Sequence, residues 1–499
     1  MVEPRLQTFK FAATLWAVLC LAIIGYYILG EKIPVNNGFG YDGEDYASYA
    51  ERFAEFRFPK VDPYRIHRIL PSAICGVTLR GLSVAPSPQA IISSFVMLSC
   101  ASLVGSFYAL AGICSSLKFS NRQSIACFIG VFLSYGALKF PSFYPVLTDF
   151  AATCLSLLAI HWWLRRRDLG VFLVTVLGAF TWPTLLLQGC VLLIFPPRVG
   201  LAIPRFVLRP AGLMGTVVLV TWFAYQTYQI YFLRSYQPTV LDGVRFSLVG
   251  VSAAFAYLAL NMWTALSCAR NEPLAPGVPM QDVRNVLLST GVRLGFAAVL
   301  FISIGYVCHR LSVGTPSVQT QSFLRDILIF GSRRPFIFVI SNTLFLGPFW
   351  LLLLISLRDF WRGSVALGAG AVILSGIAVL LALHSESRML SPLWPLVVVI
   401  LVSAVDRKWT ESKTLTGFVI SGLAVSQAWL PRGITVLDGT KSDFPAQWYF
   451  MNLGPWMGPS AYWLAGGTCL SILSWMLWVI YRKPSDIISN PSSTVEIFI

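Results

Sequence analysis

The amino-acid sequence predicts an all-α fold, a polytopic transmembrane bundle of roughly 12–14 spans with an amphipathic helix at its outer face. Of the 499 residues, 56% are hydrophobic and only 12% are charged, whereas soluble domains carry about 25% charged residues. Apolar runs of about 20 residues, long enough to cross a bilayer, recur along the chain. A chain this apolar cannot cover its own core with polar surface, so lipid is its expected solvent.

The candidate spans follow one another with short polar connections. Each is an apolar run near the length that a helix needs to cross a bilayer. They cover residues 9–29, 89–117, 123–138, 145–164, 210–233, 246–269, 286–308, 336–357, 364–383, 389–405, 415–430 and 459–481.

The apolar run 171–195 predicts two short helices instead of one span. The arginines at 165–167 precede it and Arg198 follows it, so a single span would place one basic cluster on the wrong side of the membrane. Pro183 near its centre lacks a backbone donor and interrupts a helix. We therefore expect a hairpin whose turn, near Trp182, faces outward.

The net charge of +15 does not indicate a nucleic-acid partner, because the basic residues lie between apolar runs. That pattern is typical of cytoplasmic loops, which retain Lys and Arg. It predicts a cytoplasmic N-terminus, an outer segment 30–88 and a lipid bilayer as partner. The ten cysteines show no metal-ligand or C-x-x-C spacing and are interpreted as small buried side chains.

The chain shows no soluble domain. Residues 1–430 are expected to form one transmembrane domain that includes the first outer loop, 30–88. Residues 431–481 are expected to form an outer loop and the last span, and 482–499 a short cytoplasmic tail.

Three carboxylates, Asp42, Glu44 and Asp45, lie within four positions where the chain leaves the first span. The residues that follow have helical apolar spacing, which predicts an amphipathic helix at the interface. Asp42 would then serve either as an N-terminal cap or as a general base towards an acceptor hydroxyl. The Asp-x-Glu pair also leaves open a divalent cation, Mg²⁺ or Mn²⁺, although the pair alone is a weak signal.

Two arginines follow at helical spacing, Arg65 and Arg68. The guanidinium fork suits phosphate recognition, and the alternative is that these side chains reach to lipid headgroups. His67 between them is either a proton shuttle or a structural histidine.

A second polar cluster, His384, Glu386 and Arg388, occupies the turn between two candidate spans. Ionisable residues at the edge of a span are candidates for function. The alternative is a solvated loop with an internal Glu–Arg pair. Asp149 begins another span, and a buried carboxylate there would need a partner such as Lys139 or an arginine from 309–335.

Together these motifs resemble those of bacterial members of the GT-C glycosyltransferase superfamily. The resemblance lies in Tyr-Asp-Gly-x-x-Tyr at 41–46, Pro-Tyr-Arg-x-x-Arg-Ile-Leu-Pro at 63–71, Leu-Thr-Asp at 147–149, Thr-Trp-Pro-Thr at 181–184 and Glu-Ser-Arg-x-x-x-Pro at 386–392. In the fourth motif a tryptophan stands where such proteins usually have arginine, which puts a charge role there in doubt.

This resemblance implies an integral membrane enzyme, a hexosyl or pentosyl transferase of the bacterial inner (plasma) membrane. Its donor would be a polyprenyl-phosphate-linked sugar, and its acceptor a glycan, lipid or protein outside the cytoplasm. The resemblance covers roughly the first 200 residues and, loosely, the stretch 380–400.

The resemblance also implies roles for individual residues. Asp42 would be the base, assisted by Glu44 or Asp45. The implied donor-phosphate ligands are Arg65, Arg68 and Arg388. The other expected substrate contacts are Asp149, His384 and Glu386.

Two other classes of protein remain open. A transporter or flippase of a lipid-linked saccharide would carry ionisable residues and broken helices near the midplane of several spans. A membrane scaffold would make the carboxylates dispensable.

Overall fold

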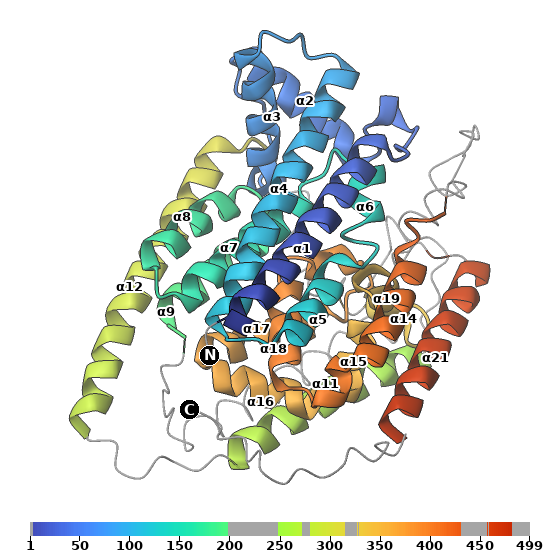
Figure 1. The fold of residues 1–499 in the computed structure, drawn as a ribbon. Coiled ribbons are helices and arrows are strands. Elements are labelled where there is room, and N and C mark those ends of the chain that lie inside the picture. Colours follow the sequence, from blue (N-terminus) through green and yellow to red (C-terminus); the bar gives the residue numbers. More distant parts are fainter. Residues whose placement is uncertain are drawn as a thin grey trace.

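A computed structural model describes residues 3–197, 248–271, 280–314, 329–430 and 459–481, together with Ile327 and Met457. Throughout these residues the regular elements are helices, as the sequence predicts (Figure 1). The expected span 210–233, the expected loop 431–458 apart from Met457, and the tail 482–499 lie outside the described residues.

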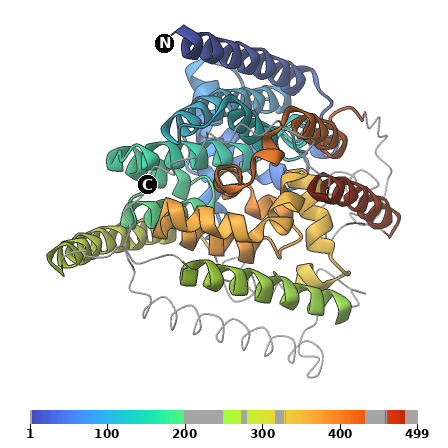
Figure 2. The ribbon, with the colours of Figure 1, turned by 60° about the horizontal axis from the view of Figure 1, so that its bottom comes forward.

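Four helices within the described ranges are long and apolar enough to cross a membrane. They are α4 (Pro88–Ser116), α11 (Leu248–Asn271), α12 (Met280–Leu311) and α21 (Pro459–Tyr481). The last three expose most of their apolar surface, and Figure 2 shows α11 and α12 at the edge of the bundle. Apolar surface on this scale needs lipid around it, which marks the chain as a membrane protein.

The predicted hairpin in the run 171–195 is confirmed. Helix α8 (Asp168–Ala179) and helix α9 (Pro183–Ile194) are separate. Trp182 between them is extended, with φ −159° and ψ 131°. Pro183 takes the first helical position, where the backbone N–H that proline lacks would have no partner within the helix.

The expected span 336–357 is divided in the structure. Helix α14 (Ile337–Leu346) ends at Gly347, whose φ of 88° suits glycine, and α15 (Phe349–Ile355) begins after Pro348. This Gly-Pro pair stops the first helix and starts the second, although apolar content alone indicated one continuous span.

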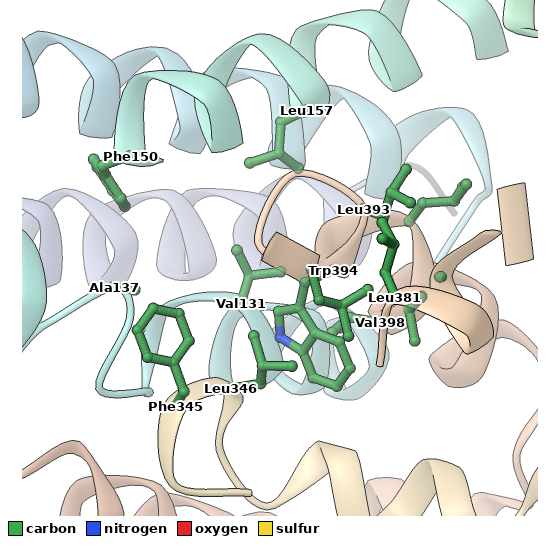
Figure 3. Close-up of a cluster of buried hydrophobic side chains, with 14 of the residues drawn as sticks. Val131, Ala137, Phe150, Leu157, Phe345, Leu346, Leu381, Leu393, Trp394 and Val398 are labelled. Carbon is green, nitrogen blue, oxygen red and sulfur yellow. The ribbon is translucent and has the colours of Figure 1, made fainter. Parts of the chain in front are cut away.

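The core centres on α18 (Trp394–Ala404), which is buried on nearly every side. It packs against α5 (Asn121–Phe132), where Trp394 Nε1 donates to the carbonyl of Gly130 at 2.9 Å. A Cβ atom on Gly130 would lie only 2.7 Å from a Val398 methyl group, so this glycine permits the close approach. Figure 3 shows Trp394 and Val398 beside Val131 in this core.

The acidic segment forms α2 (Asp42–Ala54), at the top of the bundle in Figure 1. Its apolar face buries Tyr46 and Ala50 against α3 (Ile69–Gly81). A Cβ atom on Gly76 of α3 would lie 2.3 Å from the Ala50 carbonyl oxygen, so the two helices touch backbone to backbone. The predicted apolar face is therefore covered by protein.

Segments that the charge pattern assigns to one face contact one another. The Leu70 N–H donates to the Phe180 carbonyl, and the Val313 N–H donates to the Val61 carbonyl, each at 2.8 Å. These bonds join the first outer segment to the α8–α9 turn and to the end of α12.

A separate contact lies at the opposite end of α8. Arg293 of α12 bonds Asp168 at 2.8 Å and the Leu193 carbonyl at 3.0 Å. Asp168 directly follows the arginine triplet at 165–167, which the charge pattern predicts to be cytoplasmic, so this contact connects that end of α8 to α12 and to the end of α9.

Sidedness can be tested by labelling single cysteines with a membrane-impermeant maleimide. We expect Glu51→Cys on α2 to react in intact cells, and Arg166→Cys beyond α7 (Asp149–Leu164) to react only after permeabilisation, because both positions are exposed at opposite ends of the bundle. Nine of the ten native cysteines are buried, so the unsubstituted protein is a low-background control. Equal labelling of both variants from one side would contradict the topology.

Candidate functional site

Asp42 begins α2, but its carboxylate does not cap the helix. Instead, Tyr144 Oη accepts from the backbone N–H groups of Tyr41 and Asp42, the latter at 3.1 Å. A Cβ atom on Gly40 would lie 2.3 Å from Tyr144 Cζ, so glycine makes room for this phenol. The tyrosine takes over the capping function and leaves the Asp42 carboxylate available for another partner.

That partner is Arg388, at 2.8 Å between its Nη2 and the Asp42 Oδ2. Arg388 lies in the 3-10 helix η3 (Ser387–Leu390) and also bonds Glu386 through its Nε. The side chains of Arg388 and Glu386 are only 11% and 14% exposed. One buried guanidinium is thus shared between two carboxylates, and the predicted Glu–Arg pair is buried instead of solvated.

Both carboxylates are ionised at neutral pH. Burial raises the pKa of Asp42, but the nearby charges of Arg388 and Arg68 outweigh it and hold the pKa below the ordinary 3.8. Burial likewise raises the pKa of Glu386, and Arg388 again brings it below its ordinary value. The charges therefore favour an ion-paired cluster in the resting protein.

His384 shapes the turn that carries Glu386. Its Nδ1 accepts a hydrogen bond from the Glu386 backbone N–H at 3.0 Å, and its ring packs on Phe330. Burial lowers the pKa of His384 to about 4, so the imidazole is neutral at physiological pH. This histidine orients the turn instead of adding charge to the site.

Arg68 is the second buried arginine of the site, with 2% of its surface exposed. It donates to the hydroxyls of Tyr46 at 3.3 Å and Tyr64 at 2.6 Å. Its guanidinium lies 4.1 Å from the centre of the Trp182 ring, and its Nε has no hydrogen-bond partner. Within the described residues no carboxylate lies within 4.0 Å of it, so its charge has no direct counter-ion.

The remaining predicted residues of the first outer loop form a separate set of contacts. Arg65 pairs with Asp45 at 2.7 Å and Asp62 at 3.4 Å, on a partly exposed surface. Glu44 is exposed and accepts a hydrogen bond from Asn36 at 3.1 Å. His67 Nδ1 lies 3.0 Å from the Ala179 carbonyl oxygen, which fits a structural role. The structure therefore separates Arg65, Asp45 and Glu44 from the cluster around Arg388.

Asp149 is the first residue of α7 and is 5% exposed. Neither of its carboxylate oxygens has a hydrogen-bond partner among the residues that the structure describes. Lys139, one of the partners expected from the sequence, instead bonds Glu31 at 3.3 Å and the Leu430 carbonyl at 3.1 Å. In the part of the chain that the structure describes, the Asp149 carboxylate is therefore buried without a hydrogen bond.

Sequence reasoning missed the aromatic groups that build the site. Tyr46 and Tyr64 bind Arg68, and Tyr144 caps α2. The ring of Trp182 packs on the guanidinium of Arg68. The four-residue spacing of Tyr64 and Arg68 was the one available signal, because residues at this spacing meet on a helix.

The described residues contain no group of three His, Cys, Asp or Glu side chains that could hold a metal ion. The divalent cation left open by the sequence stays a prediction. No protein-family model, curated protein or solved structure matches this chain. The functional conclusion therefore depends on the site itself.

Removing Arg388 tests the energetics of the cluster. Arg388→Met leaves Glu386 buried and unpaired, so we expect it to lower the free energy of unfolding by about 3–5 kcal/mol. Adding Glu386→Gln should restore most of that loss in a double-mutant cycle measured by unfolding in detergent. Lys408→Met, which breaks an exposed pair with Asp406, is the control and should have little effect. A double variant no more stable than Arg388→Met would contradict this account.

The pH dependence of stability tests the state of Asp42. Because its pKa is lowered on folding, its contribution is complete above the ordinary pKa of 3.8 and is lost as pH falls through the lower folded value. We expect the melting temperature to fall on acidification from about pH 5 to about pH 3. The melting temperature of Asp42→Asn should fall less than that of the wild type over the same pH range. An equal fall in the two proteins would show that Asp42 is not ion-paired.

Proposed function

We propose that the protein is a membrane glycosyltransferase that moves a sugar from a polyprenyl-phosphate-linked donor to an acceptor hydroxyl at the non-cytoplasmic face. The observation that carries this proposal is the partly buried Asp42–Arg388 contact beside Arg68. It unites the two sequence motifs that resemble GT-C enzymes across 346 positions of the chain.

The charges of the cluster suit a phosphate-bearing donor. Arg68 has no carboxylate within 4.0 Å in the described structure, and Arg388 is bound only by carboxylates that an incoming phosphate can replace. A buried cation without a counter-ion is unfavourable, so an anionic ligand gains affinity by supplying one. Two arginines near one another thus provide a site for the donor phosphate.

The same arrangement provides a base. When the phosphate binds Arg388, the Asp42 carboxylate is released from its ion pair and can accept a proton. The acceptor hydroxyl oxygen then attacks the anomeric carbon as the bond from that carbon to the phosphate oxygen breaks. The proton passes to Asp42, and polyprenyl phosphate leaves with its charge stabilised by Arg388 and Arg68.

The membrane supplies the rest of the substrate geometry. A polyprenyl chain stays in the bilayer while its phosphate and sugar remain at the interface. The cluster lies at the end of the bundle that carries α2 and α3, and the apolar helix α12 reaches this end through the Val61–Val313 bond. Holding donor and acceptor together there would supply much of the rate.

A transporter or flippase of a lipid-linked saccharide is the second candidate. It is favoured by the break between α14 and α15, which adds a second interrupted segment to the α8–α9 hairpin. Buried polar residues lie near this break, among them Asn342, which donates to the Ala382 carbonyl. The ionisable residues of the site nevertheless gather at one end of the bundle instead of at its midplane, which favours the enzyme.

The two candidates are separated by Asp42→Asn, which keeps the shape of the side chain and removes the base. We expect sugar transfer from a polyprenyl-phosphate donor to fall by about 10²–10⁴-fold, because general-base catalysis contributes this much. Glu51→Gln, an exposed substitution on the same helix, is the matched control and should retain full activity. Transfer is measured with purified protein in detergent or nanodiscs.

Full transfer activity in Asp42→Asn would exclude Asp42 as the base. Translocation of the lipid-linked sugar without any transfer, unchanged in that variant, would favour the transporter.

A further inference from the structure

The proposed reaction assigns no role to Asp149, a buried acid close to the site. It is 95% buried by surface area, and among the described residues neither of its carboxylate oxygens has a hydrogen-bond partner. A buried carboxylate without donors is strongly disfavoured, so its position calls for a ligand that supplies them.

The packing of α7 places Asp149 beside the two arginines. Ala152, one helical turn further along α7, packs in a small cluster with Trp182 and Met389. Residues three positions apart lie on the same face of a helix, so Asp149 is next to that cluster, one turn closer to the start of α7. Trp182 stacks on Arg68 there, and Met389 directly follows Arg388.

Asp149 nevertheless forms no ion pair with either arginine, since no basic nitrogen of the described residues lies within 4.0 Å of its oxygens. A carboxylate repels phosphate, so the donor phosphate belongs to the arginines and not to Asp149. The group next to that phosphate in the donor is a sugar, whose hydroxyls are neutral donors. Adjacent hydroxyls on one sugar ring match the two oxygens of a carboxylate.

We infer that Asp149 binds two neighbouring hydroxyls of the donor sugar and so selects which sugar the site accepts. This inference depends on the proposed function, because it assigns the sugar end of the same donor. It narrows the substrate class to sugars that carry two free hydroxyls close to the phosphate-bearing carbon. A sugar that lacks one of these two hydroxyls is rejected.

A structural role for Asp149 is the competing explanation. Asp149 lies in the first turn of α7, where the helix dipole favours negative charge. On that account Asp149→Asn destabilises the protein. If Asp149 is a ligand-binding residue, the same substitution removes a buried charge without a partner, and the melting temperature of the empty protein stays equal or rises.

Binding to the purified full-length protein separates the contributions of sugar and phosphate. The probes are farnesyl phosphate alone and farnesyl phosphate carrying glucose, mannose or arabinose. We expect the wild type to bind at least one sugar-bearing probe more tightly than the bare lipid. Asp149→Asn should weaken that probe by about 10- to 100-fold and leave the bare lipid unchanged, since a hydrogen bond to a charged group is lost.

Deoxy versions of the preferred probe give an independent measurement. Removing one of the two hydroxyls should weaken wild-type binding, and the loss should largely disappear in Asp149→Asn because the two changes remove the same contact. Arg68→Gln is the comparison variant and should weaken the bare and the sugar-bearing lipid alike.

Several outcomes would overturn the inference while leaving the phosphate site intact. These are equal weakening of bare and sugar-bearing probes by Asp149→Asn, no weakening of either, or wild-type binding that gains nothing from any sugar. A lower melting temperature together with additive deoxy effects would assign Asp149 to structure. Wild-type protein that binds no farnesyl phosphate at all would instead overturn the proposed function, and the inference with it.

Discussion

The ion pair between Asp42 and Arg388 is the constraint on which the end of the bundle that carries α2 and α3 depends. It ties α2 to a turn late in the chain, and Glu386 binds the same guanidinium through its Nε. Because Arg388 and Glu386 are buried, the pair persists only if the surrounding helices keep both carboxylates in reach. The close contact of α2 with α3 and the Tyr144 cap of α2 provide that support.

Arg68 is also a buried cation, but its charge is stabilised in a different way from that of Arg388. Its charge is met by two phenol hydroxyls and by the rings of Tyr64 and Trp182, which are polarisable but carry no formal charge. Cation–π contacts and neutral hydrogen bonds reduce the penalty of burial without cancelling the charge. A cation held this way keeps its attraction for an anion, whereas a carboxylate partner would have neutralised it. The ring of Trp182 therefore stabilises Arg68 and leaves the site positively charged.

The sequence predicts features that depend on local chemistry. Pro183 and the basic residues around the run 171–195 indicated the α8–α9 hairpin, and helical spacing indicated α2. The Gly347-Pro348 pair that separates α14 from α15 is also present in the sequence, but the apolar content of the run 336–357 led to the prediction of one continuous span. Contacts between residues far apart in the chain could not be predicted in this way. The charge pattern assigned Asp42 and Arg388 to one face, but only the structure shows that Asp42 pairs with Arg388 and that Asp45 pairs with Arg65.

Asp149 illustrates why buried charge cannot be interpreted from sequence alone. The sequence indicated that a carboxylate at this position needs a partner, and Lys139 was a reasonable choice because both residues lie near one end of the bundle. In the structure Lys139 bonds Glu31 and the end of α19 (Ser412–Ser426) is close by, through the Leu430 carbonyl. Lys139 thus connects the segment after the first helix to the segment after α19, and within the described residues the Asp149 carboxylate has no hydrogen-bond partner. Two arginines near an unbonded carboxylate create charge separation within one site: the positive part attracts phosphate and the negative part attracts hydroxyl donors. A phosphate-linked sugar carries a phosphate and hydroxyl groups side by side, so the same cluster of charges accounts for the binding of both the phosphate and the sugar of the proposed donor.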